Sequence, residues 1–469
     1  MELQGKATSL WRNFFNVKMV QIRTFHMTWF AFFSCFFAWF GIAPLMSVVR
    51  DELQLTQQQI GWAIIGSVSM TIFARLFIGW LCDRIGPRKS YTWLLLLGSL
   101  PVMGIGLAQT FETFLMFRVL IGCIGAAFVI TQYHTTVMFA PNIVGQANAT
   151  SAGWGNLGGG VTQFVMPLLF SVMVIGFGFS EAVGWRLSMV VVGAIIFLIG
   201  IAYYFVTQDA PEGNFDELRA QGRMPEKKKV TGNYLNALKD PRVWVLFVIY
   251  GCCFGIELTV NNVAALYFID YFDLTLVTAG FVAASFGLMN MFARTLGGIF
   301  GDNFGALWGL KGRSFWLFIC LLFEGCALMV FSQMQVLFLA LPALIVFSLF
   351  TQMAEGATYS VVPFINKKAL GAVAGVVGAG GNAGAVLAGF LFKNMIDWSE
   401  AFLILGMVVA AASFLAFFVR FSTRQEDEER AAFAAANIET LRRRADAANE
   451  ALNEGLAALD ARERAQPAE

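Results

Sequence analysis

The chain has 469 residues with a formal net charge of +1, and 58% of its residues are hydrophobic while 13% are charged. Soluble domains carry about twice that charged share, so the composition excludes an ordinary soluble globular protein and indicates one surrounded by lipid. A net charge of +1 is no global basic excess, and we expect no nucleic-acid partner. The seven cysteines lie in apolar stretches without the paired spacing of metal ligands, so we interpret them as reduced core residues and expect no metal or other cofactor.

The N-terminal residues 1–24 are basic and polar, and no small-residue cleavage site follows them ahead of the first long apolar run. This pattern predicts a cytoplasmic tail rather than a signal peptide. About 20 apolar residues in a helix cross a bilayer core of about 30 Å, and twelve segments meet that requirement, so the predicted fold is an all-α membrane protein with twelve transmembrane helices. The predicted spans lie near residues 25–49, 59–82, 90–110, 112–140, 149–178, 183–207, 242–270, 275–301, 313–333, 336–362, 370–395 and 398–420.

A polar, charged segment at residues 208–241 separates two sets of six spans. It predicts a cytoplasmic linker between an N-terminal six-helix bundle at 25–207 and a C-terminal six-helix bundle at 242–420. Residues 421–469 form a charged, alanine-rich tail. Lysine and arginine gather in alternate loops, and by the positive-inside rule this places the linker and both tails in the cytoplasm of a multi-pass protein of the cell membrane.

The two predicted bundles carry the same sequence pattern. Phe-Ala-Arg, ending at Arg75 in the second span, is followed by glycine and aspartate at spacings that recur after Arg294 in the eighth span, 219 residues later. A Gly-Asn pair ending at Asn156 in the fifth span recurs at Asn382 in the eleventh, at an offset of 226. Repeats in the same orientation predict a pseudo-two-fold axis along the membrane normal and a substrate site near the midplane between the halves.

Arg75 and Arg294 are candidate ligand-binding residues because an arginine at the centre of a membrane helix costs about 2.5–3.5 kcal/mol and usually faces a polar cavity. A guanidinium presents two parallel donors, which suit a small planar anion such as nitrate, nitrite or a carboxylate. The alternative is that each arginine pairs with a nearby carboxylate as scaffold. The acids placed well inside the apolar spans are Glu257, Glu324 and Glu355.

Two kinds of protonatable group lie at depth. A buried carboxylate beside an arginine is suited to carry a coupling proton, and we name Glu257 and Glu355 for that role; a permanently ionised partner is the alternative. His134 is either a proton relay or a histidine whose ring is satisfied in the core.

The glycine-rich stretches around Asn156 and Asn382 lie within spans, with no strand before them, so they are not phosphate-binding loops. Close packing of helices explains their glycines equally well as a ligand cavity does. Packing explains the two asparagines less well, because an amide in lipid needs hydrogen-bond partners. We expect both amides to face the cavity as hydrogen-bond donors.

The segment Gly79-Trp80-Leu81-Cys82-Asp83-Arg84-Ile85-Gly86-Pro87-Arg88-Lys89 resembles the cytoplasmic loop signature of the major facilitator superfamily. Arg118 with Gly122 and Gly125 resembles its fourth-span motif. The resemblance implies that the loop is a gate in which Asp83, Arg84 and Arg88 hold helices together in one access state. Asp302 is the second-half counterpart, but Asn303 replaces the basic residue beside it, which implies a weaker latch.

Within that superfamily, the two glycine and asparagine stretches resemble the paired signatures of the nitrate/nitrite porter family. Residues 255–262 and 354–359 resemble its high-affinity nitrate transporter branch. The resemblance implies a rocker-switch transporter that clamps nitrate between its paired arginines, Arg75 and Arg294, with Asn156 and Asn382 lining the site. It also implies aromatic packing against the anion, and Phe128 and Tyr250 match that role.

The expected function is secondary active transport of nitrate, and of nitrite as a second substrate, with proton-coupled uptake. Nitrate/nitrite exchange is an alternative, and so is a nitrate-sensing membrane receptor with residual transport in which the tail signals. A third alternative is a facilitator of another anion or of an organic substrate. The expected partners are nitrate, nitrite, protons and the lipid bilayer; no accessory protein is evident, and no nucleophile constellation suggests an enzyme.

Overall fold

The computed structural model describes residues 5–139, 144–223, 238–366, 370–393 and 397–428, together with 430, 431, 445 and 449. Within these ranges the side chains at 76, 83, 144–146 and 370–372 are not described. Among the described residues, twelve helical segments are long and apolar enough to cross a membrane, which confirms the predicted number. Residues 224–237 of the predicted linker 208–241 and most of the predicted tail 421–469 lie outside the described residues.

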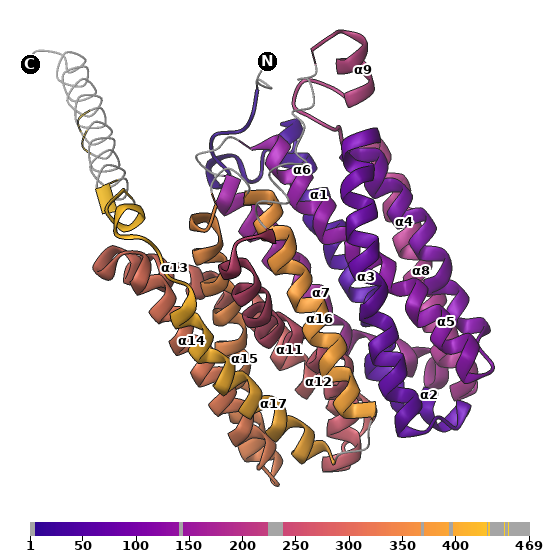
Figure 1. The fold of residues 1–469 in the computed structure, drawn as a ribbon. Coiled ribbons are helices and arrows are strands. Elements are labelled where there is room, and N and C mark those ends of the chain that lie inside the picture. The colour runs from indigo at the N-terminus through magenta and orange to yellow at the C-terminus, as the bar shows by residue number, and fades with distance from the viewer. Residues whose placement is uncertain are drawn as a thin grey trace, which may run out of the picture.

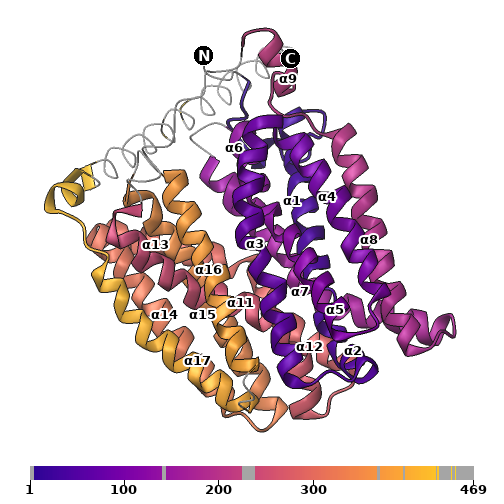
Figure 2. The same cartoon turned by 45° about the vertical axis from the view of Figure 1, so that its right-hand side comes forward.

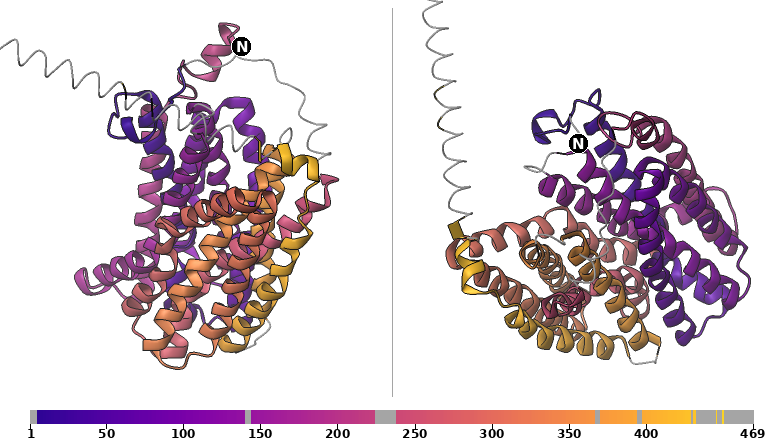
Figure 3. Two further views of the ribbon diagram at one scale, coloured as in Figure 1. Left: turned by 90° about the vertical axis from the view of Figure 1, so that its left-hand side faces the viewer. Right: turned by 45° about the horizontal axis from the view of Figure 1, so that its top comes forward.

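The first bundle contains α1 (Val20–Trp39), α2 (Met46–Leu53), α3 (Gln57–Ile85), α4 (Pro87–Gly104), α5 (Phe111–Ile121), α6 (Ala127–Met138), α7 (Val144–Ser171) and α8 (Glu181–Val206). A short helix, α9 (Phe215–Ala220), follows it. The second bundle contains α11 (Pro241–Phe272), α12 (Leu276–Leu288), α13 (Ala293–Trp308), α14 (Leu310–Ser332), α15 (Leu337–Val361), α16 (Leu370–Lys393) and α17 (Trp398–Ser413). The two bundles lie side by side (Figure 1; Figure 3, right).

The observed spans differ from the predicted ones in their interruptions. α1 begins at Val20 rather than near residue 25, and the first span continues through a 3-10 turn that contains Pro44 into α2. The eighth span, predicted as one helix, is divided into α12 and α13 by a 3-10 turn at Met289–Met291. In that turn the Asn290 amide donates to Glu257 across 2.7 Å, so a side-chain bond accompanies the break just before Arg294.

The cysteine prediction needs one correction. All seven cysteines are free, as expected, but Cys326 on α14 is exposed and is therefore not a core residue.

Local signals fix the ends of α3, the helix that carries Arg75. Thr56 caps its first turn in a reciprocal capping box with Gln59. Its other end is Gly86, whose φ of +88° favours glycine, and Pro87 opens α4 directly afterwards. Arg75 thus lies well inside the helix, and the sharp turn presents Arg88 at the start of α4.

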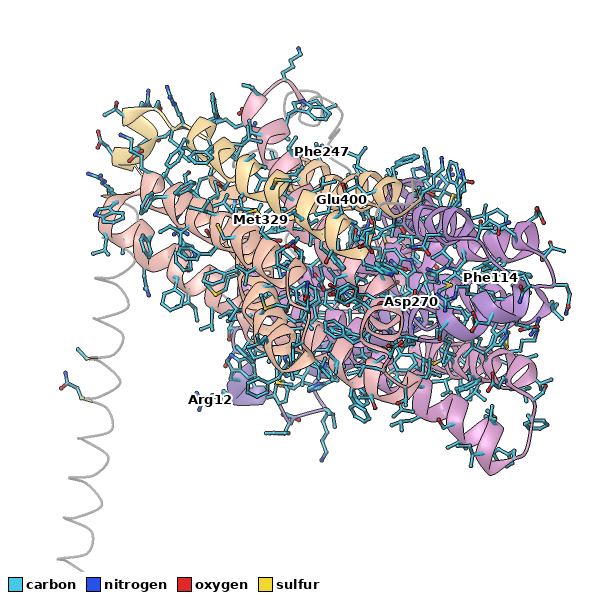
Figure 4. All side chains as sticks on the ribbon, turned by 90° about the horizontal axis from the view of Figure 1, so that it is seen from below. Arg12, Phe114, Phe247, Asp270, Met329 and Glu400 are labelled. Carbon is cyan, nitrogen blue, oxygen red and sulfur yellow. The ribbon has the colours of Figure 1, made fainter. Side chains whose placement is uncertain are left out.

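The molecule has two ends that differ in their contacts between halves. We call the end that carries α2 the Arg50 end, and the end that carries α9 and the N-terminus the Arg88 end (Figure 1; Figure 3, left). At the Arg50 end, Nη1 of Arg50 in the first half forms an ion pair with Asp270 in the second and lies 2.7 and 2.8 Å from its two carboxylate oxygens. Figure 4 looks onto this end and shows Asp270 close to the boundary of the bundles.

Two helix pairs related by the repeat form the seam between the halves: α3 packs on α16, and α7 packs on α12. A Cβ on Gly160 of α7 would lie 2.6 Å from the backbone of Gly287 of α12, so the two backbones need glycine to approach this closely. Contacts of α3 with α16 run from Trp62 beside Phe390 to Arg75 beside Gly378. Beyond that level the two helices diverge toward the Arg88 end (Figures 1 and 2).

Candidate anion-binding site

Arg75 projects from α3 toward the second half of the molecule and is partly buried. Its guanidinium lies 5.4 Å from the centre of the Phe128 ring, a cation–π arrangement. Its Nη1 donates across 3.4 Å to the carbonyl oxygen of Gly378 on α16, and its Nε is buried without a partner. In the described part of the chain, no carboxylate forms an ion pair with Arg75. Its positive charge is therefore without a direct counter-charge.

Arg294, near the start of α13, has different surroundings. Its Nη1 lies 2.8 Å from a carboxylate oxygen of Glu355 on α15, whose side chain is fully buried. Its Nη2 donates to the hydroxyl of Tyr250 across 2.8 Å, and its guanidinium lies 5.9 Å from the centre of the Phe254 ring. The carboxylate partner that the scaffold alternative requires is thus present at Arg294 and, in the described chain, is not found at Arg75.

Two tyrosines connect the arginines. Tyr250 on α11 and Tyr359 on α15 form an edge-to-face ring pair with centroids 5.1 Å apart. Tyr250 accepts from Arg294, and a Cβ on Gly378, whose carbonyl accepts from Arg75, would lie 3.3 Å from the Tyr359 hydroxyl. The tyrosine pair therefore lies between the contacts of the two arginines.

Tyr359 and Phe254 were missed as site residues in the sequence. Each lies four residues beyond a predicted member of the site, Tyr359 after Glu355 and Phe254 after Tyr250. Residues four apart share a helix face, so this spacing was the available signal.

Asn156 on α7 and Asn382 on α16 are almost fully buried, at 2% and 0% exposed. The Asn156 amide oxygen and both polar atoms of the Asn382 amide lack hydrogen-bond partners among the described residues. Asn382 lies one turn beyond Gly378, the residue that meets Arg75, and so shares its helix face. Buried amides without partners are costly, and this pair therefore has unused capacity to bind a polar ligand or water.

The glycines of the two stretches serve close packing. A Cβ on Gly155 would lie 1.8 Å from the Phe32 ring, and a Cβ on Gly381 would lie 2.3 Å from the Phe254 ring. The two contacts match between repeats. They also support the site, because Phe254 lies against Arg294 and Phe32 contacts Phe128 with ring centroids 5.8 Å apart.

Two of the three candidate acids gather near Arg294. Glu257 on α11 is fully buried and accepts from the Asn290 amide, while Glu355 interacts with both Arg294 and Glu257. Glu324 on α14 is also fully buried but forms no ion pair with an arginine in the described chain. The second half thus holds a carboxylate pair beside its arginine.

His134 lies outside this group of contacts. It is fully buried on α6, where its Nε2 lies 2.8 Å from the carbonyl oxygen of Gln208 and its Nδ1 lies 2.7 Å from the Tyr203 hydroxyl. A carbonyl only accepts, so Nε2 donates and, in a neutral ring, Nδ1 accepts from the tyrosine. Both ring nitrogens have partners, as expected of a core histidine.

The first-half loop at the Arg88 end is bound to the segment that follows α8. The Arg88 backbone N–H donates to the Asp209 carboxylate across 2.8 Å, and Arg88 Nη1 donates to Asn214 across 2.8 Å. Burial raises the pKa of Asp209 above its ordinary value. The Arg84 guanidinium covers the Trp80 ring, and the Arg84 carbonyl accepts from Arg219. The Asp83 side chain is outside the described residues.

The second-half counterpart is a simpler contact. Asp302 on α13 pairs with Arg313 on α14 across 2.5 Å, within the second bundle. The described contacts of both loops at this end, at Arg84 and Arg88 and at Asp302, are therefore made without bridging the halves. The described contacts of Arg84, Arg88 and Asp302 therefore lie within one half or with the segment that follows α8.

Twelve spans in two repeats of the same orientation, with an arginine at the equivalent position of each, are the architecture of a helical membrane transporter. The model of the Major Facilitator Superfamily matches residues 28–364. The high affinity nitrate transporter 2.5 of Arabidopsis thaliana is 40% identical over 392 residues, which cover 84% of this chain and 77% of that protein. The nitrate/nitrite transporter NrtP of Nostoc punctiforme is 30% identical over 467 residues, which cover 85% of this chain and 92% of that protein.

A solved structure supports the fold. The bacterial homolog to the human lysosomal transporter Spinster, in an inward-facing and occupied conformation, superposes with a TM-score of 0.67 at 14% identity and covers 89% of this chain and 100% of its own. The chain belongs to the major facilitator superfamily and, within it, to the nitrate/nitrite transporter family, so it is a transporter rather than an enzyme. The resemblance noted in the sequence is confirmed.

Proposed function

We propose that this protein carries nitrate, with nitrite as a second substrate, across the cell membrane by alternating access, and that the anion binds between Arg75 and Arg294. The observation that carries the proposal is that Arg75 reaches across the seam to Gly378 of α16, one turn from Asn382, whose buried amide has no partner among the described residues. The repeat-equivalent Arg294 lies in the facing half, where it contacts Tyr250. Guanidinium forks and amide groups suit a small planar oxyanion. The names of the relatives support nitrate as that anion.

The direction of transport depends on which end faces the cytoplasm. The Arg88 end carries basic loop residues such as Arg84, Arg88 and Lys89 as well as the N-terminus, and by the positive-inside rule we assign it to the cytoplasm. The Arg50 end is then extracellular. Because the described contacts between halves lie from the Arg50 end to the level of Arg75, we assign this conformation to the inward-facing part of the cycle.

Glu355 is the proposed carrier of the coupling proton. It neutralises Arg294 directly and also interacts with Glu257, so protonating it raises the charge of the site by one unit and frees the arginine to bind the anion. Proton binding and anion binding then favour each other through linkage. A membrane potential negative inside opposes entry of one anion by about 2.3 kcal/mol per 100 mV, and symport of more than one proton per anion overcomes that opposition.

The test is nitrate uptake into proteoliposomes that contain the full chain, with and without an imposed pH gradient. We expect faster uptake when the inside is alkaline. Glu355→Gln should remove the gradient dependence and leave nitrate counterflow, whereas Glu324→Gln, another buried acid of the same half, should keep it. Uptake that requires internal nitrite would establish exchange instead, and no nitrate flux in any condition would refute the substrate assignment.

The sensing alternative rested on the C-terminal tail, most of which lies outside the described residues. No observation on the described part favours it over transport. Its distinctive outcome is loss of a cellular nitrate response, with uptake unchanged, after removal of the residues beyond Arg424.

A further inference from the structure

A third arginine lies buried in the membrane, away from the proposed binding pair. Arg118 on α5 is 1% exposed. Its Nη2 donates to the amide oxygen of Asn262 across 2.8 Å, its Nη1 donates to the carbonyl of Trp39 across 3.3 Å, and its Nε has no partner. In the described part of the chain no carboxylate forms an ion pair with it. A full positive charge is therefore buried among neutral acceptors.

The principal bond of Arg118 crosses the seam between the halves. Asn262 belongs to α11 of the second half, where its own amide nitrogen donates to the Leu258 carbonyl across 2.8 Å. The Ser67 hydroxyl of α3 lies 3.4 Å from the same Asn262 oxygen. When the halves separate at this level, the guanidinium loses its best acceptor, because Asn262 moves with the other half.

Arg118 lies on the extracellular side of the proposed anion site. Ser67, which shares its partner, is eight residues before Arg75 on α3 toward the Arg50 end, or roughly 12 Å along a helix. Asn262 is twelve residues beyond Tyr250 on α11 in the same direction, or roughly 18 Å. An anion that enters from the Arg50 end passes this level before it reaches Arg75.

We propose that Arg118 is a capture site for the incoming oxyanion in the outward-open state, and that Asn262 takes the place of the anion when the outer end closes. This inference rests on the proposed function above. An amide oxygen and a nitrate or nitrite oxygen are both acceptors for the same guanidinium donors. Closure therefore exchanges one acceptor for another, releases the anion toward Arg75, and leaves the guanidinium hydrogen-bonded throughout the cycle.

Charge explains why an arginine without a carboxylate suits this task. A carboxylate partner at Arg118 would compete with the anion in the open state and would also hold the outer end shut. A neutral amide does neither. A low-dielectric funnel that contains one uncompensated cation raises the local concentration of anions and their rate of association.

The experiment measures nitrate flux in both directions in proteoliposomes that contain uniformly oriented full-length protein. Arg118→Gln should raise the KM for nitrate on the Arg50 side at least 10-fold and change the KM on the Arg88 side less than 3-fold. The control is the double variant Arg186→Gln/Glu52→Gln, which removes an ion pair that lies within the first half at the same end and should leave both KM values within 2-fold.

A second variant keeps Arg118 in place. Asn262→Asp should form an ion pair across the seam, slow uptake from the Arg50 side at least 10-fold, and leave nitrate affinity in detergent within 3-fold. The inference is overturned if Arg118→Gln shifts both KM values equally, if it shifts neither, or if Asn262→Asp transports normally. Wild-type protein without nitrate flux would instead refute the proposed function, so the two failures are distinguishable.

Discussion

Arg75 and Arg294 occupy equivalent places in the two halves, but their electrostatic surroundings differ. Arg294 is paired with Glu355 at 2.8 Å, and Glu257 is close by. Arg75 contacts a ring and a backbone carbonyl, and no carboxylate pairs with it in the described chain. The repeat thus determines where the two arginines lie. The sequence differences between the halves determine which arginine has a carboxylate partner.

This difference suggests a division of labour. A guanidinium without a counter-charge attracts an anion at any protonation state of the site, so Arg75 suits constant binding. A guanidinium held by a carboxylate is free for the anion only when that carboxylate is protonated or displaced, so Arg294 suits coupling. Because the repeats differ in this way, protonation would change the affinity for the bound anion through Arg294 and not through Arg75.

The largest expected effect is loss of transport when either arginine is replaced, and protein stability then distinguishes the two variants. Arg75→Gln and Arg294→Gln should each reduce nitrate transport at least about 100-fold, because each removes a charge-assisted fork. Arg294→Gln should also destabilise the protein by about 3–5 kcal/mol, because it leaves the buried Glu355 without its partner. Arg75→Gln should not destabilise the protein in this way, because no carboxylate in the described chain pairs with Arg75. Thermal unfolding in detergent alongside uptake measures both quantities.

The double variant Arg294→Gln/Glu355→Gln is the control for that difference. It should recover most of the stability while remaining inactive. Equal destabilisation by the two single substitutions would contradict the asymmetry of the pair.

The next effect concerns geometry rather than charge. Arg75→Lys and Arg294→Lys retain the positive charge but lose the bidentate fork, and a charged hydrogen bond contributes about 1.5–3 kcal/mol. Nitrate affinity should therefore fall about 10- to 100-fold in each variant. Direct binding of nitrate in detergent is the measurement, and wild-type affinity in either lysine variant would show that the fork is not required.

Much of this arrangement was predictable from the sequence. Hydropathy gave the twelve spans, and the identical spacing after Arg75 and Arg294 gave the repeat, because both depend on local pattern. The pairing of Arg294 with Glu355 was not predictable, because Glu257, Glu324 and Glu355 are all acids within spans of the same half. Only the rotation and packing of α11, α14 and α15 choose among them.

Other features escaped the sequence for similar reasons. The contribution of Phe254 depends on which face of α11 meets α13, and a periodic apolar helix does not show that. The break at Met289–Met291 coincides with a side-chain bond between Asn290 and Glu257, which depends on how α11 packs against this span. The loops at Arg88 and Asp302 were expected to act as gates. Which residues they contact depends on the conformation of the transporter, and a local sequence motif does not specify that conformation.

The glycines that pack against Phe32 and Phe254 test a feature that the two halves share. Gly155→Ala presses on Phe32 and Gly381→Ala presses on Phe254, and overpacking of this kind costs about 1–3 kcal/mol. We expect both variants to lose stability by similar amounts and to raise the nitrate KM several-fold, since each moves a ring that belongs to one arginine's surroundings. Gly298→Ala, at a position with open space, is the control and should behave like wild type. A large difference between Gly155→Ala and Gly381→Ala would show that this packing is not shared.

The smallest expected effect compares the two loops at the Arg88 end. Asp209 is 2% exposed and accepts from the backbone N–H groups of Arg88 and Phe215, whereas Asp302 has a largely exposed side chain that pairs with Arg313. Surface ion pairs contribute about 0–1 kcal/mol, so Asp302→Asn should change the transport rate less than about 2-fold. Asp209→Asn removes the negative charge and replaces one of the two oxygens that accept these N–H groups with a donor. It should release the segment around α9, which protease cleavage after Arg219 or Arg223 reports. If Asp302→Asn slows transport more than Asp209→Asn does, the second-half loop, and not the first, carries the gating contact.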